Sequence, residues 1–121
     1  MPKKTNKNSS FSESINYALE GIVVAIKTER NVRIHIYIGM LVIILCLIFG
    51  VTSSELKELI SVISLVLFAE LMNTAIEATV DISTSRYHPL AKKAKDVAAG
   101  AVLIVSLNAG VIGYIIFSKK I

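Results

Sequence analysis

The sequence predicts an all-α membrane protein with three transmembrane helices and an N-terminal amphipathic surface helix, so that 1–121 forms a single integral-membrane domain. Of its 121 residues, 54% are hydrophobic and only 18% are charged, and the mean hydropathy is +0.66. Two segments, 34–54 and 97–118, carry no formal charge, and each has the roughly 20 residues that cross a hydrocarbon core. A third apolar segment, 59–80, has similar length, and three such spans leave no room for a separate soluble domain.

The segment before the first span predicts a flexible basic tail over 1–9 and a surface helix over 10–30. The sequence S-F-S-E that starts at Ser10 has the spacing of a capping box, in which a serine and a glutamate three residues later bond each other's backbone. The polar side chains that follow gather on one side of a helical wheel and the aliphatic ones on the other. Such a helix is too interrupted to span the membrane and should lie at its interface. The first long apolar run begins only near Ile34, so we expect no cleavable signal.

The turn between the first two spans is indicated by Gly50 and by the T-S-S-E sequence that starts at Thr52. Either Ser53 or Ser54 is expected to cap the second span, since serine accepts a hydrogen bond from the first turn of a helix. The three spans are expected at 34–52, 58–81 and 96–118.

The basic residues predict the orientation of the chain in the membrane. Ten of the thirteen Lys and Arg lie before the first span or in the 82–96 loop, whereas the 51–58 loop carries only Lys57. By the positive-inside rule the N-terminus and the 82–96 loop are cytoplasmic, and the C-terminus lies outside. The net charge of +4 does not indicate a nucleic-acid partner, because the basic residues flank apolar spans and are not interleaved with aromatic residues.

The second span carries a polar stripe in an apolar setting. At 100° per residue, five side chains fall within about 100° of one another, and they are Glu70, Asn73, Thr74, Glu77 and Asp81. Each ionised carboxylate in hydrocarbon costs at least a few kcal/mol, so the stripe needs a compensating cation, a partner or a function. Ion pairs with neighbouring helices are one explanation, but we expect no basic residue at membrane depth on the other spans. His35, at the start of the first span, is expected to contact headgroups or the interface.

Three carboxylates and one lysine are expected near the cytoplasmic edge of the membrane. Glu29 precedes the first span, Glu77 lies two turns nearer the cytoplasm than Glu70, and Lys95 and Asp96 head the third span. Magnesium usually takes one or two protein carboxylates and completes its shell with water and phosphate oxygens. This arrangement is compatible with phosphoryl transfer from a soluble nucleotide to a lipid hydroxyl. The usual Gly-rich phosphate loop is absent, so side chains at the helix ends would hold the nucleotide.

Three segments resemble a known family, the bacterial integral-membrane diacylglycerol kinases. They are K-T-E-R-N-V-R-I-H, E-L-M-N-T-A-I-E-A-T-V-D and Y-H-P-L-A-K-K-A-K-D-V-A-A-G-A-V. Within this family the sequence looks like the Gram-positive branch, whose members are mostly undecaprenol kinases, and the resemblance covers about 12–117. It implies a homotrimer in the bacterial cell membrane, with active sites between subunits, that phosphorylates a membrane lipid with ATP and Mg²⁺.

The resemblance also implies roles for individual residues. Glu70 matches the proposed catalytic base, which contacts the lipid substrate, and Asn73 matches an asparagine that supports the reacting groups. Glu29 and Glu77 match the carboxylates that bind the magnesium of Mg-ATP. Besides these two carboxylates, the nucleotide contacts that it implies are Tyr17, Arg86, Tyr87, His88, Lys95 and Asp96.

Two hypotheses of different classes follow from the sequence. The first is a lipid kinase, with undecaprenol as the expected substrate and diacylglycerol as the alternative, because both present a primary hydroxyl at the interface. The second is a small non-enzymatic membrane protein, such as a pore or a regulatory subunit. A pore needs a polar stripe along a whole span, whereas 59–69 has only serines as polar residues. The sequence therefore favours the kinase.

Overall fold

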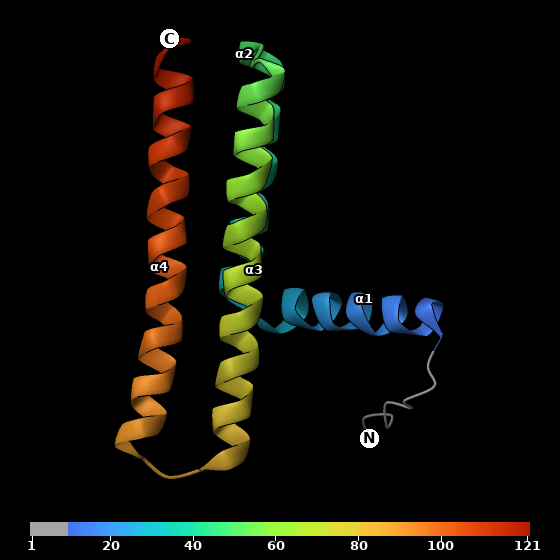
Figure 1. Cartoon of the computed structure of the whole chain (residues 1–121), viewed down its shortest axis with the longest axis vertical. Helices are drawn as coiled ribbons and strands as arrows, with labels where there is room; N and C mark the ends of the chain where they lie inside the picture. The colour runs from blue at the N-terminus through green and yellow to red at the C-terminus, as the bar shows by residue number, and fades with distance from the viewer. Residues whose placement is uncertain (1–9) are drawn as a thin grey trace.

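The computed structural model describes residues 10–121, and this part of the chain forms four helices, namely α1 (Phe11–Thr28), α2 (Arg30–Phe49), α3 (Ser53–Ser83) and α4 (Pro89–Ser118). The three long helices run alongside one another, and α1 leaves them at a steep angle (Figure 1). This confirms the predicted all-α fold with three long helices and a shorter N-terminal one. The basic tail predicted over 1–9 lies outside the described residues.

The starts of α1 and α3 are set by capping residues. The Glu13 backbone N–H donates to Ser10 Oγ at 3.2 Å, as the capping-box spacing predicts. At α3 the expected cap, Ser53 or Ser54, is wrong, because Thr52 is the N-cap. Thr52 Oγ1 accepts from the Glu55 N–H at 3.1 Å, and Glu55 Oε1 accepts from the Thr52 N–H at 2.9 Å. A reciprocal pair needs a glutamate three residues after the cap, and of the three candidates only Thr52 has one.

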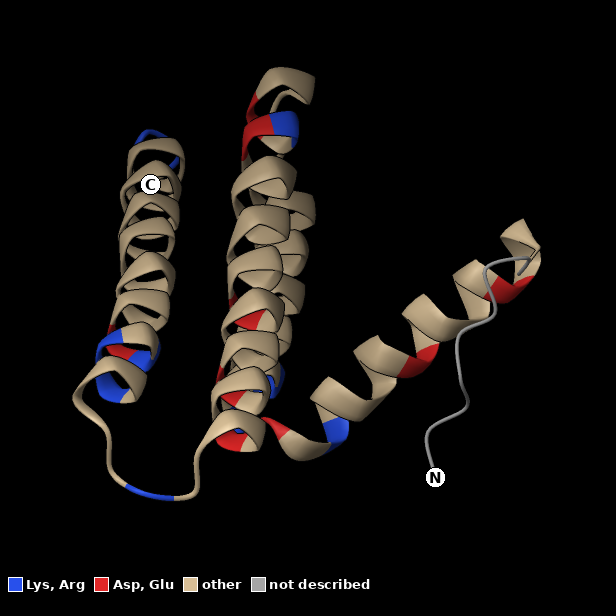
Figure 2. Ribbon diagram, turned by 60° about the horizontal axis from the view of Figure 1, so that its bottom comes forward, with Lys and Arg blue, Asp and Glu red and all other residues tan. Residues whose placement is uncertain are grey.

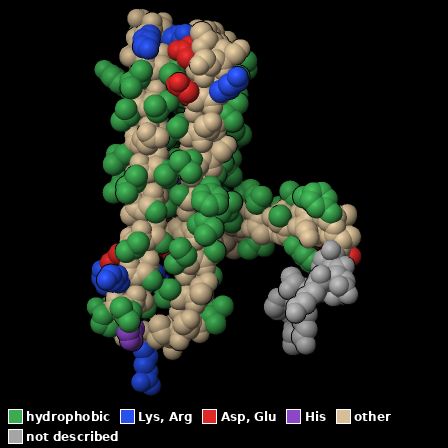
Figure 3. Space-filling model, viewed as in Figure 1, with side chains coloured by type: hydrophobic (Ala, Val, Ile, Leu, Met, Phe, Trp, Pro, Cys, Tyr) green, Lys and Arg blue, Asp and Glu red, His purple; other side chains and the backbone are tan. Residues whose placement is uncertain are grey.

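The long helices are exposed along most of their apolar length. All three are long and apolar enough to cross a membrane, and hydrophobic side chains cover much of their surface between charged ends (Figure 3). At 1.5 Å per residue the 31 residues of α3 span about 46 Å, which exceeds a hydrocarbon core of about 30 Å. The exposed apolar side chains therefore face lipid or another protein surface, and the ends of α3 extend beyond the core.

A buried cluster joins the three long helices at the end remote from α1. There Leu59, Cys46 and Ile116 are buried together, one from each long helix. Lys120 Nζ lies 2.8 Å from Glu55 Oε1, which ties the C-terminal end of the chain to the start of α3. Nearer the middle, a Cβ at Gly39 would lie 3.2 Å from a methyl of Ile63, so the glycine allows α2 to approach α3 closely.

The junction between α1 and α2 is stabilised by Arg33. Its guanidinium donates to the Ile26 carbonyl at 2.8 Å and to the Lys27 carbonyl at 3.0 Å, so it satisfies carbonyls in the last turn of α1, which lack partners within that helix. Glu29 is the single extended residue between the two helices. α3 and α4 continue past the level of this junction to the loop that joins them (Figure 1), which leaves their ends free to form a site.

Candidate active site

Charged side chains gather at the end of the molecule that carries the α3–α4 loop. Acidic residues occur along the lower half of α3 and at the α1–α2 junction, and basic residues occur at the start of α4 (Figure 2). The predicted site residues in this region form two groups at different depths along the helices. The deeper group is centred on Glu70, and the outer group surrounds the α3–α4 loop.

Glu70 is a buried carboxylate whose partner is a histidine. Its residue surface is 4% exposed, and His35 Nε2 on α2 lies 3.1 Å from its Oε1. The expectation that no basic residue reaches membrane depth is therefore wrong for Glu70, and His35 lies against this carboxylate. His35 is the second residue of the uncharged segment 34–54. Because α3 continues past the level of the α1–α2 junction (Figure 1), a residue near the start of α2 lies beside the interior of α3 and not beside its end.

Asn73 and Glu77 continue the polar stripe along α3. Asn73 Nδ2 donates to Glu77 Oε1 at 3.3 Å, and both residues are half-buried. Asn73 Oδ1 is buried and has no hydrogen-bond partner. A buried acceptor of this kind normally has a partner, so the carbonyl end of Asn73 is available to a donor such as a hydroxyl group.

Glu29 lies half-buried at the α1–α2 junction, where its side chain makes no capping hydrogen bond. Within residues 10–121, no three His, Cys, Asp or Glu side chains gather closely enough to form a metal cage. Magnesium does not need such a cage, because it usually takes one or two protein carboxylates together with phosphate oxygens and water. The carboxylates of the uncapped Glu29 and the half-buried Glu77 are of the ligand type that Mg²⁺ takes.

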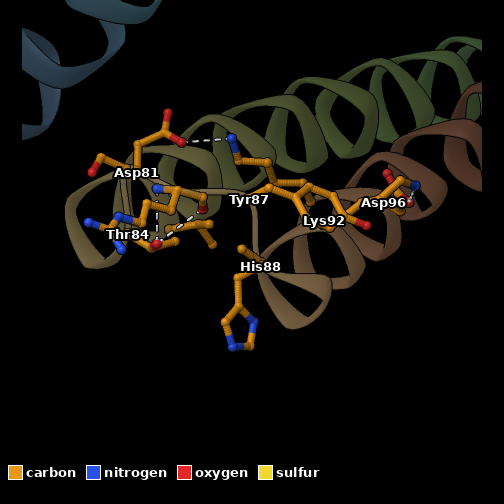
Figure 4. A pocket seen from close by; sticks show the side chains of 11 residues that line it. Asp81, Thr84, Tyr87, His88, Lys92 and Asp96 are labelled. Carbon is orange, nitrogen blue, oxygen red and sulfur yellow. Dashed lines mark hydrogen bonds and ion pairs between the residues drawn. The ribbon is translucent and has the colours of Figure 1, made fainter.

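The α3–α4 loop encloses a pocket of about 300 Å³ (Figure 4). Five of the residues expected to contact nucleotide line it, and they are Arg86, Tyr87, His88, Lys95 and Asp96. Lys95 Nζ lies 2.6 Å from Asp81 Oδ1, which joins α4 to α3. Lys92 pairs with Asp96 one turn along α4. The pocket thus combines three cationic side chains with two carboxylates close to the helix ends.

Local structure explains how the loop is shaped. Thr84 Oγ1 donates to the Arg86 carbonyl at 3.1 Å and accepts from the Arg86 N–H at 3.2 Å, which turns the chain after α3. His88 caps α4 with Nδ1, which accepts from the Leu90 N–H at 3.1 Å, and Pro89 takes the first helical position, which suits its fixed φ. The His88 ring points away from Lys92 and Asp96 (Figure 4), so in this conformation it serves the helix start.

Tyr17 is not brought to either group. It lines a separate pocket of about 300 Å³ on α1 together with Glu13, Asn16 and Glu20. The two groups on α3 are also apart, because the eleven residues from Glu70 to Asp81 correspond to about 16 Å along a helix. A single chain therefore separates the buried carboxylate from the lysine of the loop pocket.

An apolar groove of about 400 Å³ extends from His35 between the three long helices. Its lining is almost wholly aliphatic or glycine, and it ends near Tyr114 and Phe117 on α4. Ser106 lines it, and the Ser106 hydroxyl is buried without a hydrogen-bond partner. The sequence had no signal for this groove, because it arises where α2 and α4 diverge on either side of α3.

The chain is similar in sequence to known proteins of one family. The sequence pattern of the prokaryotic diacylglycerol kinases matches residues 16–117. Over its whole length the chain is 37% identical to an undecaprenol kinase of Bacillus subtilis, all of which it covers. It is 41% identical over 83% of its length to a diacylglycerol kinase of Synechocystis, of which it covers 58%. A diacylglycerol kinase of Haemophilus influenzae is 32% identical over 94% of the chain, which covers 98% of that protein.

Proposed function

The chain belongs to the prokaryotic diacylglycerol kinase family, and we propose that it transfers the γ-phosphoryl group of ATP to the primary hydroxyl of undecaprenol. The observation that carries a lipid kinase is the buried Glu70 carboxylate beside an apolar groove, with a cationic pocket at the neighbouring helix ends. The groove suits a hydrocarbon chain and the pocket suits a polyphosphate. A lipid kinase binds one substrate of each kind, a lipid and ATP, and transfers a phosphoryl group between them.

Glu70 is the general base in this proposal. The lipid hydroxyl must lose its proton as its oxygen attacks the γ-phosphorus, and a carboxylate within hydrogen-bond reach can accept that proton. The free Asn73 Oδ1 is on the same face of α3, where it can accept a hydrogen bond from the substrate and orient it. Phosphoryl transfer otherwise depends on positioning and charge neutralisation.

Glu29 and Glu77 hold the metal in this proposal. When bound, Mg²⁺ neutralises phosphate charge, which supports attack by an oxygen nucleophile. Asn73 orients Glu77 through the 3.3 Å bond from Nδ2, so one asparagine serves both the carboxylate and, through its carbonyl, the substrate. The cationic side chains of the loop pocket, Arg86 and Lys95, bind the nucleotide phosphates, with Tyr87 and Asp96 beside them. In the same proposal Tyr17 and His88 contact the nucleotide after it binds.

The choice of undecaprenol over diacylglycerol is supported by the character of the groove. Its lining offers the Ser106 hydroxyl, His35 and the Tyr114 hydroxyl as its polar side-chain groups. A site that selects diacylglycerol should aim hydrogen-bond donors at the ester carbonyls, because such bonds are what distinguish these groups. A polyprenol has no esters, so an almost wholly apolar groove suffices. The full-length similarity to the Bacillus subtilis undecaprenol kinase points the same way.

Orientation and assembly complete the proposal. The three apolar helices make this a multi-pass membrane protein, and the basic end with α1 and the α3–α4 loop faces the cytoplasm, where ATP is available. The separation of about 16 Å along α3 between Glu70 and the lysine partner Asp81 supports an active site completed by another subunit. The exposed apolar faces of the long helices are available for a homotrimer.

The experiment that tests the function is a phosphoryl-transfer assay of the purified protein in detergent. Labelled ATP is offered with undecaprenol, with diacylglycerol, or with neither lipid. We expect the kcat/KM for undecaprenol to be higher than that for diacylglycerol. Without lipid, we expect little hydrolysis of the labelled ATP. Transfer to diacylglycerol alone would leave the mechanism standing and overturn the substrate, whereas transfer to neither would overturn the kinase.

A further inference from the structure

We propose that His35 is a positioning residue for the phosphoryl transfer, which holds the Glu70 carboxylate in place through its Nε2–H. The inference rests on the proposed function, in which Glu70 is the base. It starts from one contact, the 3.1 Å between His35 Nε2 on α2 and Glu70 Oε1 on α3.

Within the described residues, His35 supplies the one polar contact of the Glu70 carboxylate. The neighbours that share its face are engaged elsewhere, since Asn73 donates to Glu77 and the Thr74 hydroxyl donates to the Glu70 backbone carbonyl at 3.0 Å. A glutamate has three side-chain torsions, so without a partner its carboxylate would sample several rotamers. The contact with α2 therefore determines where the two carboxylate oxygens lie.

The burial of the two side chains fits this role. The Glu70 side chain is 5% exposed and the His35 side chain 21% exposed, so the contact is largely shielded from the surroundings. A buried carboxylate needs hydrogen-bond donors to be retained in its charged form. An imidazole donates from Nε2 both when charged and in one of its neutral tautomers. His35 can therefore serve a buried base without placing a second permanent charge in the membrane.

The groove relates the pair to the substrate. His35 lies at one end of the apolar groove of about 400 Å³, together with Ile38 and Gly39 of the same helix. A hydrocarbon chain in that groove brings its hydroxyl end to the His35–Glu70 pair. With Oε1 taken by His35, Oε2 is the oxygen left to accept the hydroxyl proton. A shift of about 1 Å in such a group can cost about 100-fold in rate.

The test distinguishes the effect of losing the hydrogen-bond donor at Nε2 from the effect of changing the size of the side chain. In His35→Gln the amide nitrogen stands at the position of Nε2, whereas in His35→Asn it reaches only as far as Nδ1, and His35→Leu has no donor. We expect kcat to fall about 10- to 100-fold in the Leu and Asn variants, with the KM for ATP within about twofold of wild type. His35→Gln should keep at least about a third of kcat, because the donor is retained. Tyr37→Phe, which changes an exposed side chain on the same helix, is the matched control with unchanged kcat.

Two outcomes would overturn the inference. If His35→Leu keeps wild-type kcat while Glu70→Gln is inactive, Glu70 is the base and needs no help from His35. If His35→Gln loses as much activity as His35→Asn, with both variants folded by circular dichroism and gel filtration, the donor at Nε2 is not what matters. Full activity of Glu70→Gln would instead contradict the proposed base itself. Should His35→Leu fail to fold, the Gln and Asn pair still decides the question, because both side chains are polar amides.

Discussion

Lys95 on α4 is already engaged by Asp81 on α3, with 2.6 Å between Lys95 Nζ and Asp81 Oδ1. Both side chains are well exposed, at 40% and 65%, and such surface pairs contribute little to stability because solvent screens their charges. The pair is therefore weak enough to be exchanged for another anion. A nucleotide phosphate that enters the loop pocket competes with Asp81 for the same ammonium.

The first prediction separates these two partners of Lys95. Lys95→Met should raise the KM for ATP by about tenfold, as expected when a charge-assisted phosphate contact is lost. Asp81→Asn should change that KM by less than about threefold, because the cation remains. Initial rates at varied ATP and saturating lipid give both values. An equal loss in both variants would mean that the pair acts as a structural tie between α3 and α4.

The second prediction concerns the base. Glu70→Gln keeps the size and the contact with His35 but removes the proton acceptor, so kcat should fall at least about 100-fold. Binding of Mg-ATP, measured with a fluorescent analogue, should remain. Leu71→Met, next to Glu70 but outside the polar stripe, is the control for activity that is lost during purification of any variant. Near-normal turnover in Glu70→Gln would remove Glu70 from the mechanism.

A third prediction addresses the metal. Glu29→Ala and Glu77→Ala each remove one of two proposed ligands, and each should raise the Mg²⁺ concentration needed for half-maximal activity, because magnesium tolerates little irregularity in its shell. Glu77→Gln is a useful companion, since it removes the charge and can still accept from Asn73. Glu20→Ala, on the exposed face of α1, is the control. Unchanged Mg²⁺ titrations in the Glu29 and Glu77 variants would place the metal elsewhere.

Much of the fold could be predicted from patterns that are local in the sequence. Two uncharged segments and a third apolar segment of membrane length predicted the long helices, and the spacing of Ser10 and Glu13 predicted the start of α1. The cap of α3 was misjudged because three hydroxyl residues follow one another, and only the reciprocal bond between Thr52 and Glu55 selects among them. The charges at residues 81 and 95 limited the expected spans, although the backbone stays helical through both, from Ser53 to Ser83 and from Pro89 onward.

The site was predictable only where its members share one helix or one loop. Helical periodicity placed Glu70, Asn73 and Glu77 on one face of α3, and proximity in sequence grouped the residues of the loop pocket. The contact between His35 and Glu70 joins residues from two helices, and no periodicity within one helix sets the register between them. The groove is hidden for the same reason, because it depends on how far α2 and α4 stand apart.

The fourth prediction concerns sharing of the site between subunits. Glu70 and the Lys95–Asp81 pair are separated by about 16 Å along α3, so a site that uses both is better completed across an interface. Mixing Glu70→Gln subunits with Lys95→Met subunits, assayed at an ATP concentration well below the raised KM of the Lys95 variant, should then give more activity than the two preparations give separately, because some sites receive both intact residues. A mixture of two Glu70→Gln preparations is the control and should stay inactive. Full activity of a monomer isolated in detergent would contradict a shared site.

The last prediction concerns the lipid. A Cβ at Gly113 would meet no other atom within 4 Å, and Gly113 lines the apolar groove, so Gly113→Leu should fill the groove without disturbing the helix. The KM for undecaprenol should rise at least about fivefold while the KM for ATP stays unchanged, since the variant removes ground-state binding of one substrate alone. Val111→Leu, on an exposed face of the same helix, is the control. If Gly113→Leu leaves undecaprenol kinetics intact, the chain lies outside this groove, and its nearly donor-free lining is no longer an argument for a polyprenol.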